Sequence, residues 1–172
     1  MLRERIKINM KCLIFSDSHG CESGITKALS MHKDAEVVFF LGDGLSDVDS
    51  VAAFDKSRMW ISVKGNCDLR SYFREREVDK TEEITLEGRK IVLTHGDLYG
   101  VKYGDTGIKN LALSRKADIV LFGHTHTPYE KYENEVKPIY FFNPGSISSP
   151  SFSFGIMTVT ESGVIFSHGK AY

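Results

Sequence analysis

Short, uninterrupted apolar runs recur along the chain, and each is bounded by Gly, Asp, Asn or Ser. Such runs are typical of strands that are buried on both faces of a sheet. The pattern predicts central strands at residues 12–15, 37–41, 60–63, 91–93, 119–122 and 139–142.

Apolar residues at helical spacing predict helices at residues 22–33, 46–56 and 106–116, with Ser46 as the N-cap of the second. The tight pair Glu87-Gly88 predicts a hairpin between residues 84–86 and 90–93, and Glu161-Ser162-Gly163 predicts another between 155–160 and 164–167. Strands alternate with helices in the first half and dominate the second. We therefore expect an α/β (α+β) fold, a four-layer αββα sandwich of two packed mixed β-sheets flanked by helices.

The length of 172 residues suits one domain, which we expect to span residues 1–172 with residues 1–9 as a short N-terminal extension. Lys and Arg are balanced by Asp and Glu to a formal net charge of −1. A duplex-binding protein usually carries a basic face that contacts phosphates. We therefore expect no binding of duplex nucleic acid.

The chain has three cysteines, Cys12, Cys21 and Cys67, with no C-x-x-C spacing. An odd number without this spacing argues against a disulfide scaffold and a zinc ribbon, and favours the reducing cytoplasm. No apolar run approaches the roughly 18 to 20 residues that cross a bilayer, and no signal peptide is evident. We expect a cytoplasmic protein without a membrane partner.

Polar side chains that can bind metal follow five successive predicted strands. The carboxyl ends of strands line the ligand crevice of open α/β sheets, so these loops are expected to converge and form a metal site. In chain order the residues are Asp17 and His19; Asp43; Asn66, Cys67 and Asp68; His95; and His124 and His126.

Spacing and chemistry both favour metal binding. Asp17 and His19 are two residues apart, as are His124 and His126, so each pair can point to one side of an extended segment. Carboxylate, imidazole and amide donors suit Mn²⁺, Fe²⁺, Zn²⁺, Co²⁺ or Ni²⁺. The donors are too many for one ion, and two ions about 3.5 to 4 Å apart are the usual arrangement for phosphoester hydrolysis.

In this order the blocks resemble the calcineurin-like metallophosphoesterase superfamily, whose pattern is D-x-H, G-D, G-N-H-D/E, a lone His and G-H-x-H. A further loop resembles the small bacterial and archaeal YfcE-like branch. The matching residues are Asp17-Ser18-His19, Gly42-Asp43, Gly65-Asn66-Cys67-Asp68, His95, Gly123-His124-Thr125-His126 and Asn143-Pro144-Gly145-Ser146.

The resemblance implies a metal-dependent phosphoesterase, first of all a phosphodiesterase with weak monoesterase activity, acting on a small phosphoester substrate. It implies two divalent ions, Mn²⁺ first and Ni²⁺, Zn²⁺, Fe²⁺ or Co²⁺ as alternatives, and a metal-bridging hydroxide as nucleophile. It also implies a homodimer or tetramer, and catalytic roles for Asn66, Cys67 and Asp68. One ion would be held by Asp17, His19, Asp43 and His126, and the other by Asp43, Asn66, His95 and His124, with Asp43 as the bridge.

Three positions depart from the broad pattern of the superfamily. Cys67 stands where many members have a His that assists the leaving group, and a thiol is a weaker donor than imidazolium. Asp97 replaces the second His of a His-Gly-His common in the branch, which puts a carboxylate near the site. Ser151 stands where relatives often have an Arg, so one phosphate contact is lost.

Other interpretations remain beside the hydrolase. Taken singly, each block reads as an ordinary turn or helix cap. A non-catalytic protein-binding scaffold on the same fold, like the retromer subunit that resembles this branch, is the main alternative, although such scaffolds tend to lose ligands. Phosphatases with a C-x₅-R or D-x-D nucleophile motif do not fit, and the Gly-rich motifs of a nucleotide-binding regulator are missing.

Overall fold

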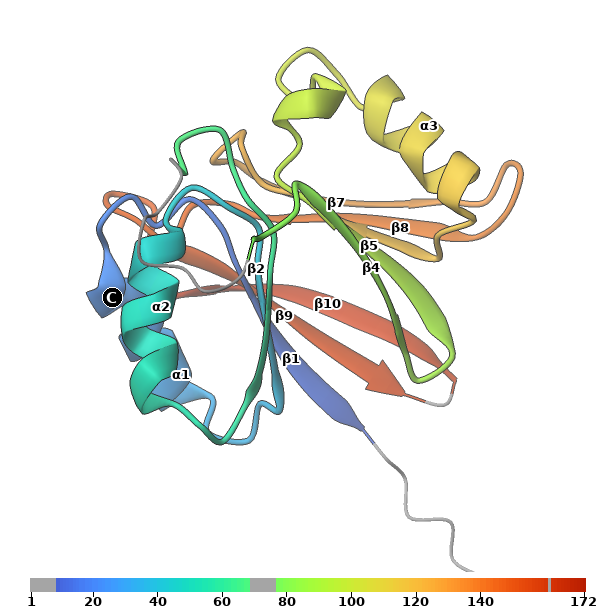
Figure 1. Ribbon diagram of the computed structural model, residues 1–172. Coiled ribbons are helices and arrows are strands. Elements are labelled where there is room, and N and C mark those ends of the chain that lie inside the picture. Colours follow the sequence, from blue (N-terminus) through green and yellow to red (C-terminus); the bar gives the residue numbers. More distant parts are fainter. Residues whose placement is uncertain (1–8, 69–76, 161) are drawn as a thin grey trace, which may run out of the picture.

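A computed structural model describes residues 9–68, 77–160 and 162–172. Two five-stranded sheets pack face to face, with α1 (Glu22–Met31) and α2 (Leu45–Phe54) on the outer face of one and α3 (Thr106–Arg115) on the outer face of the other (Figure 1). The predicted four-layer sandwich of two mixed sheets is confirmed.

The first sheet has the order β10-β9-β1-β2-β3. Its three parallel strands, β1 (Met10–Phe15), β2 (Val37–Phe40) and β3 (Met59–Ser62), are linked through α1 and α2. The last two strands, β9 (Ser153–Thr160) and β10 (Gly163–Lys170), form a hairpin that pairs antiparallel with β1. The ends of β1, β2 and β3 therefore point to the same edge of the sheet.

The second sheet has the order β4-β5-β6-β8-β7. Strands β5 (Arg89–Thr94), β6 (Ile119–Leu121) and β8 (Ile139–Pro144) are parallel, and the outer strands β4 (Thr81–Leu86) and β7 (Pro128–Glu133) pair with them antiparallel. A short 3₁₀ helix, η1 (Asp97–Tyr99), and α3 connect β5 to β6.

Alternation along the strands divides the core into layers. In β1, Cys12 and Ile14 pack between the two sheets, whereas Leu13 and Phe15 pack beneath α1 and α2. A third cluster joins the second sheet to α3 through Val120 and its neighbours. Strands covered on both faces must be apolar on both faces, which explains the uninterrupted runs in the sequence.

The predicted elements agree with the structure to within a few residues, with two exceptions. The prediction missed β7, whose residues alternate between exposed and half-buried and begin with a proline, as edge strands can. Ser46 is not the N-cap of α2, because the helix begins at Leu45 and Gly44 is the capping residue. Residues 1–8 of the expected extension and Glu161 of the expected turn lie outside the described residues. Within the described part of the chain, no helix is long and apolar enough to cross a membrane.

Candidate metal centre

The two sheets contribute different metal-binding side chains at the carboxyl ends of their parallel strands. The first sheet supplies Asp17 and His19 after β1 and Asp43 after β2, whereas the second supplies imidazoles after β5 and β6. Three groups of possible ligand atoms lie within 4.8 Å of one another. The groups are Asp17, His19 and His126; Asp43, His95 and His124; and His19, Asp43 and Cys67.

The backbone is strained where these side chains leave it. Eight of the described non-glycine residues have positive φ, and five of those belong to the predicted ligand set. Positive φ is costly for a residue with a Cβ and persists where surrounding structure enforces it, often at functional sites. The five are Asp17, His19, Asp43, His124 and His126.

Asp17 carries one buried oxygen without a protein partner. Its Oδ2 accepts hydrogen bonds from the Ser16 hydroxyl at 2.5 Å and from the His124 backbone N–H at 3.1 Å. Its Oδ1 has no hydrogen-bond partner among the described residues, and it lies 3.1 Å from His126 Nε2 and 3.8 Å from His19 Nε2. Leaving a buried carboxylate oxygen unpaired is costly, whereas a cation bound there would satisfy it.

His95 is fully buried and oriented by its second ring nitrogen. Its Nδ1 lies 2.7 Å from the Leu41 carbonyl oxygen, which can only accept, so Nδ1 carries the proton and Nε2 faces the site. This Nε2 is 3.2 Å from Asp43 Oδ2 and 3.1 Å from His124 Nδ1. A hydrogen bond that fixes the far nitrogen in this way is usual for a metal-binding histidine.

Charges at the site shift several pKa values. Burial tends to raise the pKa of Asp43, but hydrogen bonds from His95 and the Cys67 backbone hold it well below its usual range. Burial tends to lower the pKa of His95, yet its contact with Asp43 and the charge of Asp17 raise it overall. The pKa of His124 is lowered by burial and by its positive neighbours His95 and Lys102. Asp43 therefore stays ionised, as a metal ligand must.

The loop after β3 places Asn66, Cys67 and Asp68 beside Asp43. The Cys67 backbone N–H donates to Asp43 Oδ1 at 2.7 Å, and the Asn66 side-chain amide contacts Cys67 Sγ at 3.2 Å. A side chain at Gly65 would collide with the Asp43 carboxylate, so the loop needs glycine there. A hydrogen bond with Asp43, followed by burial, raises the pKa of the Cys67 thiol.

Asp68 faces the backbone and not the ligand atoms. One of its oxygens accepts the N–H groups of Asp43 and Gly65 at 2.8 and 2.9 Å, and the other accepts those of Gly44 and Leu45 at 2.8 and 2.9 Å. The carboxylate thus sits at the N-terminus of α2, where a negative charge is favourable. Asp68 thus holds the backbone around Asp43 through these hydrogen bonds, and its predicted catalytic role stays a prediction.

Three further polar residues support the ligand loops, and the sequence did not single out their roles. Asp47 accepts hydrogen bonds from the Ser18 hydroxyl at 2.5 Å and the Gly20 N–H at 2.8 Å. Asn143 donates to the Gly123 carbonyl at 2.8 Å, and Ser146 donates to the Asp17 carbonyl at 2.8 Å. The N-P-G-S block was the only sequence signal for the last two.

Two of the residues that depart from the pattern of the superfamily, Asp97 and Ser151, make defined contacts in the structure. Asp97 pairs with Lys80 at 2.7 Å, which offsets the negative charge that the sequence placed near the site. The Ser151 carbonyl accepts a hydrogen bond from Lys170 at 2.6 Å. Neither residue belongs to the ligand groups found among the described residues.

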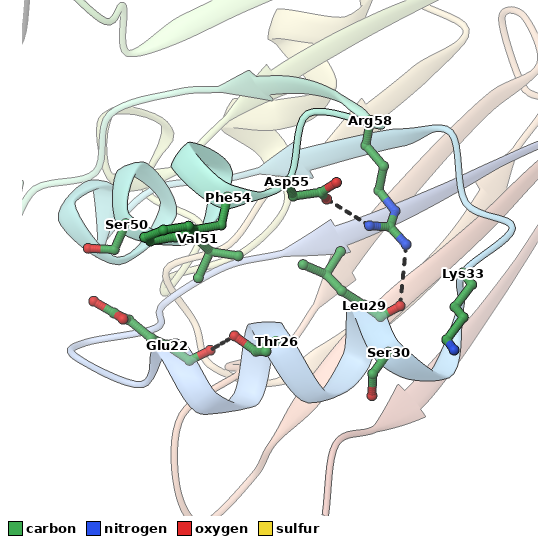
Figure 2. Close-up of a pocket in the computed structure, with 10 residues that line it drawn as sticks. All are labelled: Glu22, Thr26, Leu29, Ser30, Lys33, Ser50, Val51, Phe54, Asp55 and Arg58. Carbon is green, nitrogen blue, oxygen red and sulfur yellow. Dashed lines mark hydrogen bonds and ion pairs between the residues drawn. The ribbon is translucent and has the colours of Figure 1, made fainter.

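A second hollow lies between α1 and α2, on the helical side of the first sheet (Figure 2). This α1–α2 groove has a volume of about 470 Å³, and its described lining includes none of the predicted metal ligands. Its one guanidinium, that of Arg58, is held by Asp55 and by backbone carbonyls. The lining residues are Glu22, Thr26, Leu29, Ser30, Lys33, Ser50, Val51, Phe54, Asp55 and Arg58.

The residues at the strand ends fit divalent cations. Asp17 Oδ1 is orphaned at the centre of one ligand group, while Asp43 and two imidazole nitrogens converge in another. Asp43 also belongs to the group that contains His19, so it lies between the two. Mixed oxygen and nitrogen donors of this kind suit Mn²⁺, Fe²⁺, Co²⁺, Ni²⁺ and Zn²⁺.

Known metallophosphoesterases are similar to this chain over most of its length. A family model described as the calcineurin-like phosphoesterase superfamily domain matches residues 10–162. The chain is 31% identical over 154 residues to a probable metallophosphoesterase of Bacillus subtilis, YsnB, covering 87% of this chain and 85% of the relative. It is 28% identical over 166 residues to the phosphodiesterase YfcE of Escherichia coli, covering 82% and 81%. In fold it is similar to Vps29 of Entamoeba histolytica complexed with Zn²⁺, with a TM-score of 0.66, 21% identity, and coverage of 95% of this chain and 100% of that chain.

Proposed function

The chain belongs to the calcineurin-like phosphoesterase superfamily, and we propose that it hydrolyses small phosphodiesters at a site for two divalent cations. Family membership implies a phosphoester hydrolase that depends on metal. The observation that carries the dinuclear site is the orphaned Asp17 Oδ1 beside a second ligand group centred on Asp43.

The ligands divide between the two cations around Asp43. Asp17, His19, Asp43 and His126 would hold one, and Asp43, Asn66, His95 and His124 the other. Two bound cations lower the pKa of water and offset charge on a phosphoryl group. The hydrogen bond from His95 Nδ1–H to the Leu41 carbonyl turns Nε2 toward the site, and the contacts of Asp43 keep that carboxylate ionised. No protein nucleophile is then required.

The preference for diesters rests on Cys67. A monoester with a poor leaving group benefits from a general acid, and efficient proton transfer needs a donor whose pKa lies near the working pH. Hydrogen bonding to Asp43 raises the pKa of the Cys67 thiol away from that range. The chain therefore lacks the imidazolium donor of many family members at this position, which favours substrates with a good leaving group. The name of the relative YfcE, a phosphodiesterase, supports the same preference.

The alternative is a protein-binding scaffold on the same fold. The Vps29 neighbour was solved with Zn²⁺, so metal binding alone does not separate a scaffold from an enzyme. The convergence of the Asp and His ligands and the strained backbone of five of them favour catalysis, because strain of this kind is retained where function requires it.

A measurement of turnover distinguishes the enzyme from the scaffold. Metal-stripped protein is mixed with an aryl phosphodiester or the matching monoester and titrated with Mn²⁺, Ni²⁺, Co²⁺, Zn²⁺ or Mg²⁺. We expect metal-dependent hydrolysis with the diester favoured, and loss of at least about 100-fold in His124→Ala, as when one electrostatic partner of a transition state is removed. His32→Gln, a histidine change on the far side of the first sheet, is the control. A folded wild type that is inactive with every metal would support the scaffold instead.

Other expectations accompany the proposal. We infer Mn²⁺ as the first working metal, a single domain over residues 1–172 with self-association into a dimer or tetramer, and a cytoplasmic location. The three cysteines are free thiols, which supports a reducing compartment. Light scattering and metal analysis of protein purified without added metal would test the assembly and the ion.

A further inference from the structure

The third ligand group contains a sulfur atom that the family pattern does not use as a ligand. Cys67 Sγ, a carboxylate oxygen of Asp43 and a ring nitrogen of His19 lie within 4.8 Å of one another. The two groups of oxygen and nitrogen donors lie within the same limit. The chain therefore presents a mixed sulfur, nitrogen and oxygen set beside the site of the two cations.

Local structure holds this sulfur in place. The Cys67 backbone N–H donates to Asp43 Oδ1 at 2.7 Å, which ties the residue to the carboxylate that would share the cation. His19 is held at positive φ on the facing loop, and its backbone N–H donates to the Asp43 carbonyl at 3.2 Å. Cys67 and His19 are both exposed, so a cation can reach them from solvent.

The chemistry of these donors differs from that of the main site. Thiolate ligands select softer cations such as Zn²⁺ and Cd²⁺, whereas carboxylates suit Mn²⁺ and Mg²⁺. A cysteine, a histidine and a carboxylate leave a fourth position open on a tetrahedral cation. A cation at this position would compete with the working metals for Asp43.

We propose that Cys67, His19 and Asp43 bind a thiophilic divalent cation, Zn²⁺ or Cd²⁺, in a mode that displaces Mn²⁺ from Asp43 and inhibits the enzyme. Binding breaks the S–H bond of Cys67, forms a sulfur–metal bond and releases the proton to solvent. The inhibition rests on the proposed function, whereas the sulfur–metal bond can be observed without turnover.

Cadmium provides a direct measurement, because a thiolate–Cd²⁺ bond has an ultraviolet charge-transfer absorption. Metal-stripped protein titrated with Cd²⁺ should show this band in the wild type and in Cys21→Ser, and lose it in Cys67→Ser. Cys21 is a suitable control because it is partly accessible and belongs to none of the ligand groups among the described residues. In Mn²⁺-dependent turnover, Cys67→Ser should weaken Cd²⁺ inhibition by about tenfold or more, a loss comparable to that of an outer partner of a metal ligand.

The outcomes separate the two proposals. A band that persists in Cys67→Ser, or a wild type without a band, overturns the sulfur site even if Mn²⁺-dependent turnover is present. A band that depends on Cys67 in a protein without turnover under any metal supports the sulfur site and overturns the hydrolase. Equal Cd²⁺ inhibition of wild type and Cys67→Ser would show that inhibition does not act through this thiol.

Discussion

Two polar regions border the first sheet, and they differ in how far their charged groups are hydrogen-bonded within the protein. In the α1–α2 groove, the Arg58 guanidinium donates to Asp55 at 2.7 Å and to the carbonyls of Ala35, Leu29 and His32 at 3.1 to 3.3 Å (Figure 2). At the strand ends, Asp17 Oδ1 is buried without a hydrogen-bond partner among the described residues, and the Nε2 atoms of His126 and His19 lie 3.1 and 3.8 Å from it. In the groove the charged guanidinium has hydrogen-bond partners within the protein, whereas at the strand ends the carboxylate oxygen has none.

The backbone shows the same contrast. Of the described non-glycine residues with positive φ, five are predicted metal ligands and none lines the groove. A polar network that is satisfied internally stabilises a fold, whereas buried donors and acceptors that converge without partners carry a free-energy cost that a ligand can remove. The candidate metal centre therefore differs from the groove because polar atoms without hydrogen-bond partners converge there, and not because it is more polar.

The largest effect on turnover is expected from Asp17→Asn. The change keeps the shape of the side chain but removes the charge that faces the cation, so turnover should fall at least about 100-fold. Mn²⁺ at 100 times its dissociation constant stabilises the wild type by about 2.7 kcal/mol, which raises its melting temperature by roughly 5 to 11 °C. The melting temperature of the variant should rise less with Mn²⁺ than that of the wild type, because only the second ligand group around Asp43 is left intact.

The same melting experiment contains its own control. If the wild type and Asp17→Asn gain equally from Mn²⁺, the orphaned oxygen does not bind metal, and the contrast between the two regions fails. Metal-stripped samples of both proteins should melt cooperatively, which shows that loss of turnover is not loss of the fold.

A smaller effect is expected from Asp68→Asn. The amide offers one acceptor oxygen where the carboxylate offers two, so the backbone N–H groups of Asp43 and Gly44 can no longer both be satisfied. Residues that orient a metal ligand typically contribute 10- to 100-fold to metal affinity or activity, and we expect a loss of about that size. The concentration of Mn²⁺ needed for half-maximal turnover should rise.

The pH profile separates positioning from catalysis at Asp68. A positioning residue changes the Mn²⁺ requirement and leaves the shape of the profile intact, whereas loss of a general acid or base removes one limb. Asp34→Asn is the matched control, because that carboxylate is 70% exposed and pairs with Lys11 away from the metal ligands. Turnover of Asp68→Asn equal to that of Asp34→Asn would refute the positioning role.

The sequence predicted which Asp and His side chains meet at the strand ends because each follows a buried strand, and buried strands are recognisable as apolar runs. It could not predict the partners of Asp68 or Asp47, because a carboxylate that accepts backbone N–H groups leaves no periodic signal. The same limit applies to β7, whose polar alternation resembles a loop until a neighbouring strand pairs with it. Periodicity reports burial, whereas hydrogen-bond partners depend on which loops meet in space.

The smallest effect on turnover is expected from Arg58→Met, although its effect on stability is large. Hydrogen bonds to a charged group contribute about 1.5 to 3 kcal/mol, so the free energy of unfolding should fall by about that amount. Turnover per folded molecule should not change, because the guanidinium donates to Asp55 and to the carbonyls of Leu29, His32 and Ala35, none of which is a predicted metal ligand. Lys33→Met removes the same charge from an exposed position in the groove and is the control. If Arg58→Met kept its stability but altered the Mn²⁺ dependence, the two regions would be energetically linked, and the satisfied network would have a functional role after all.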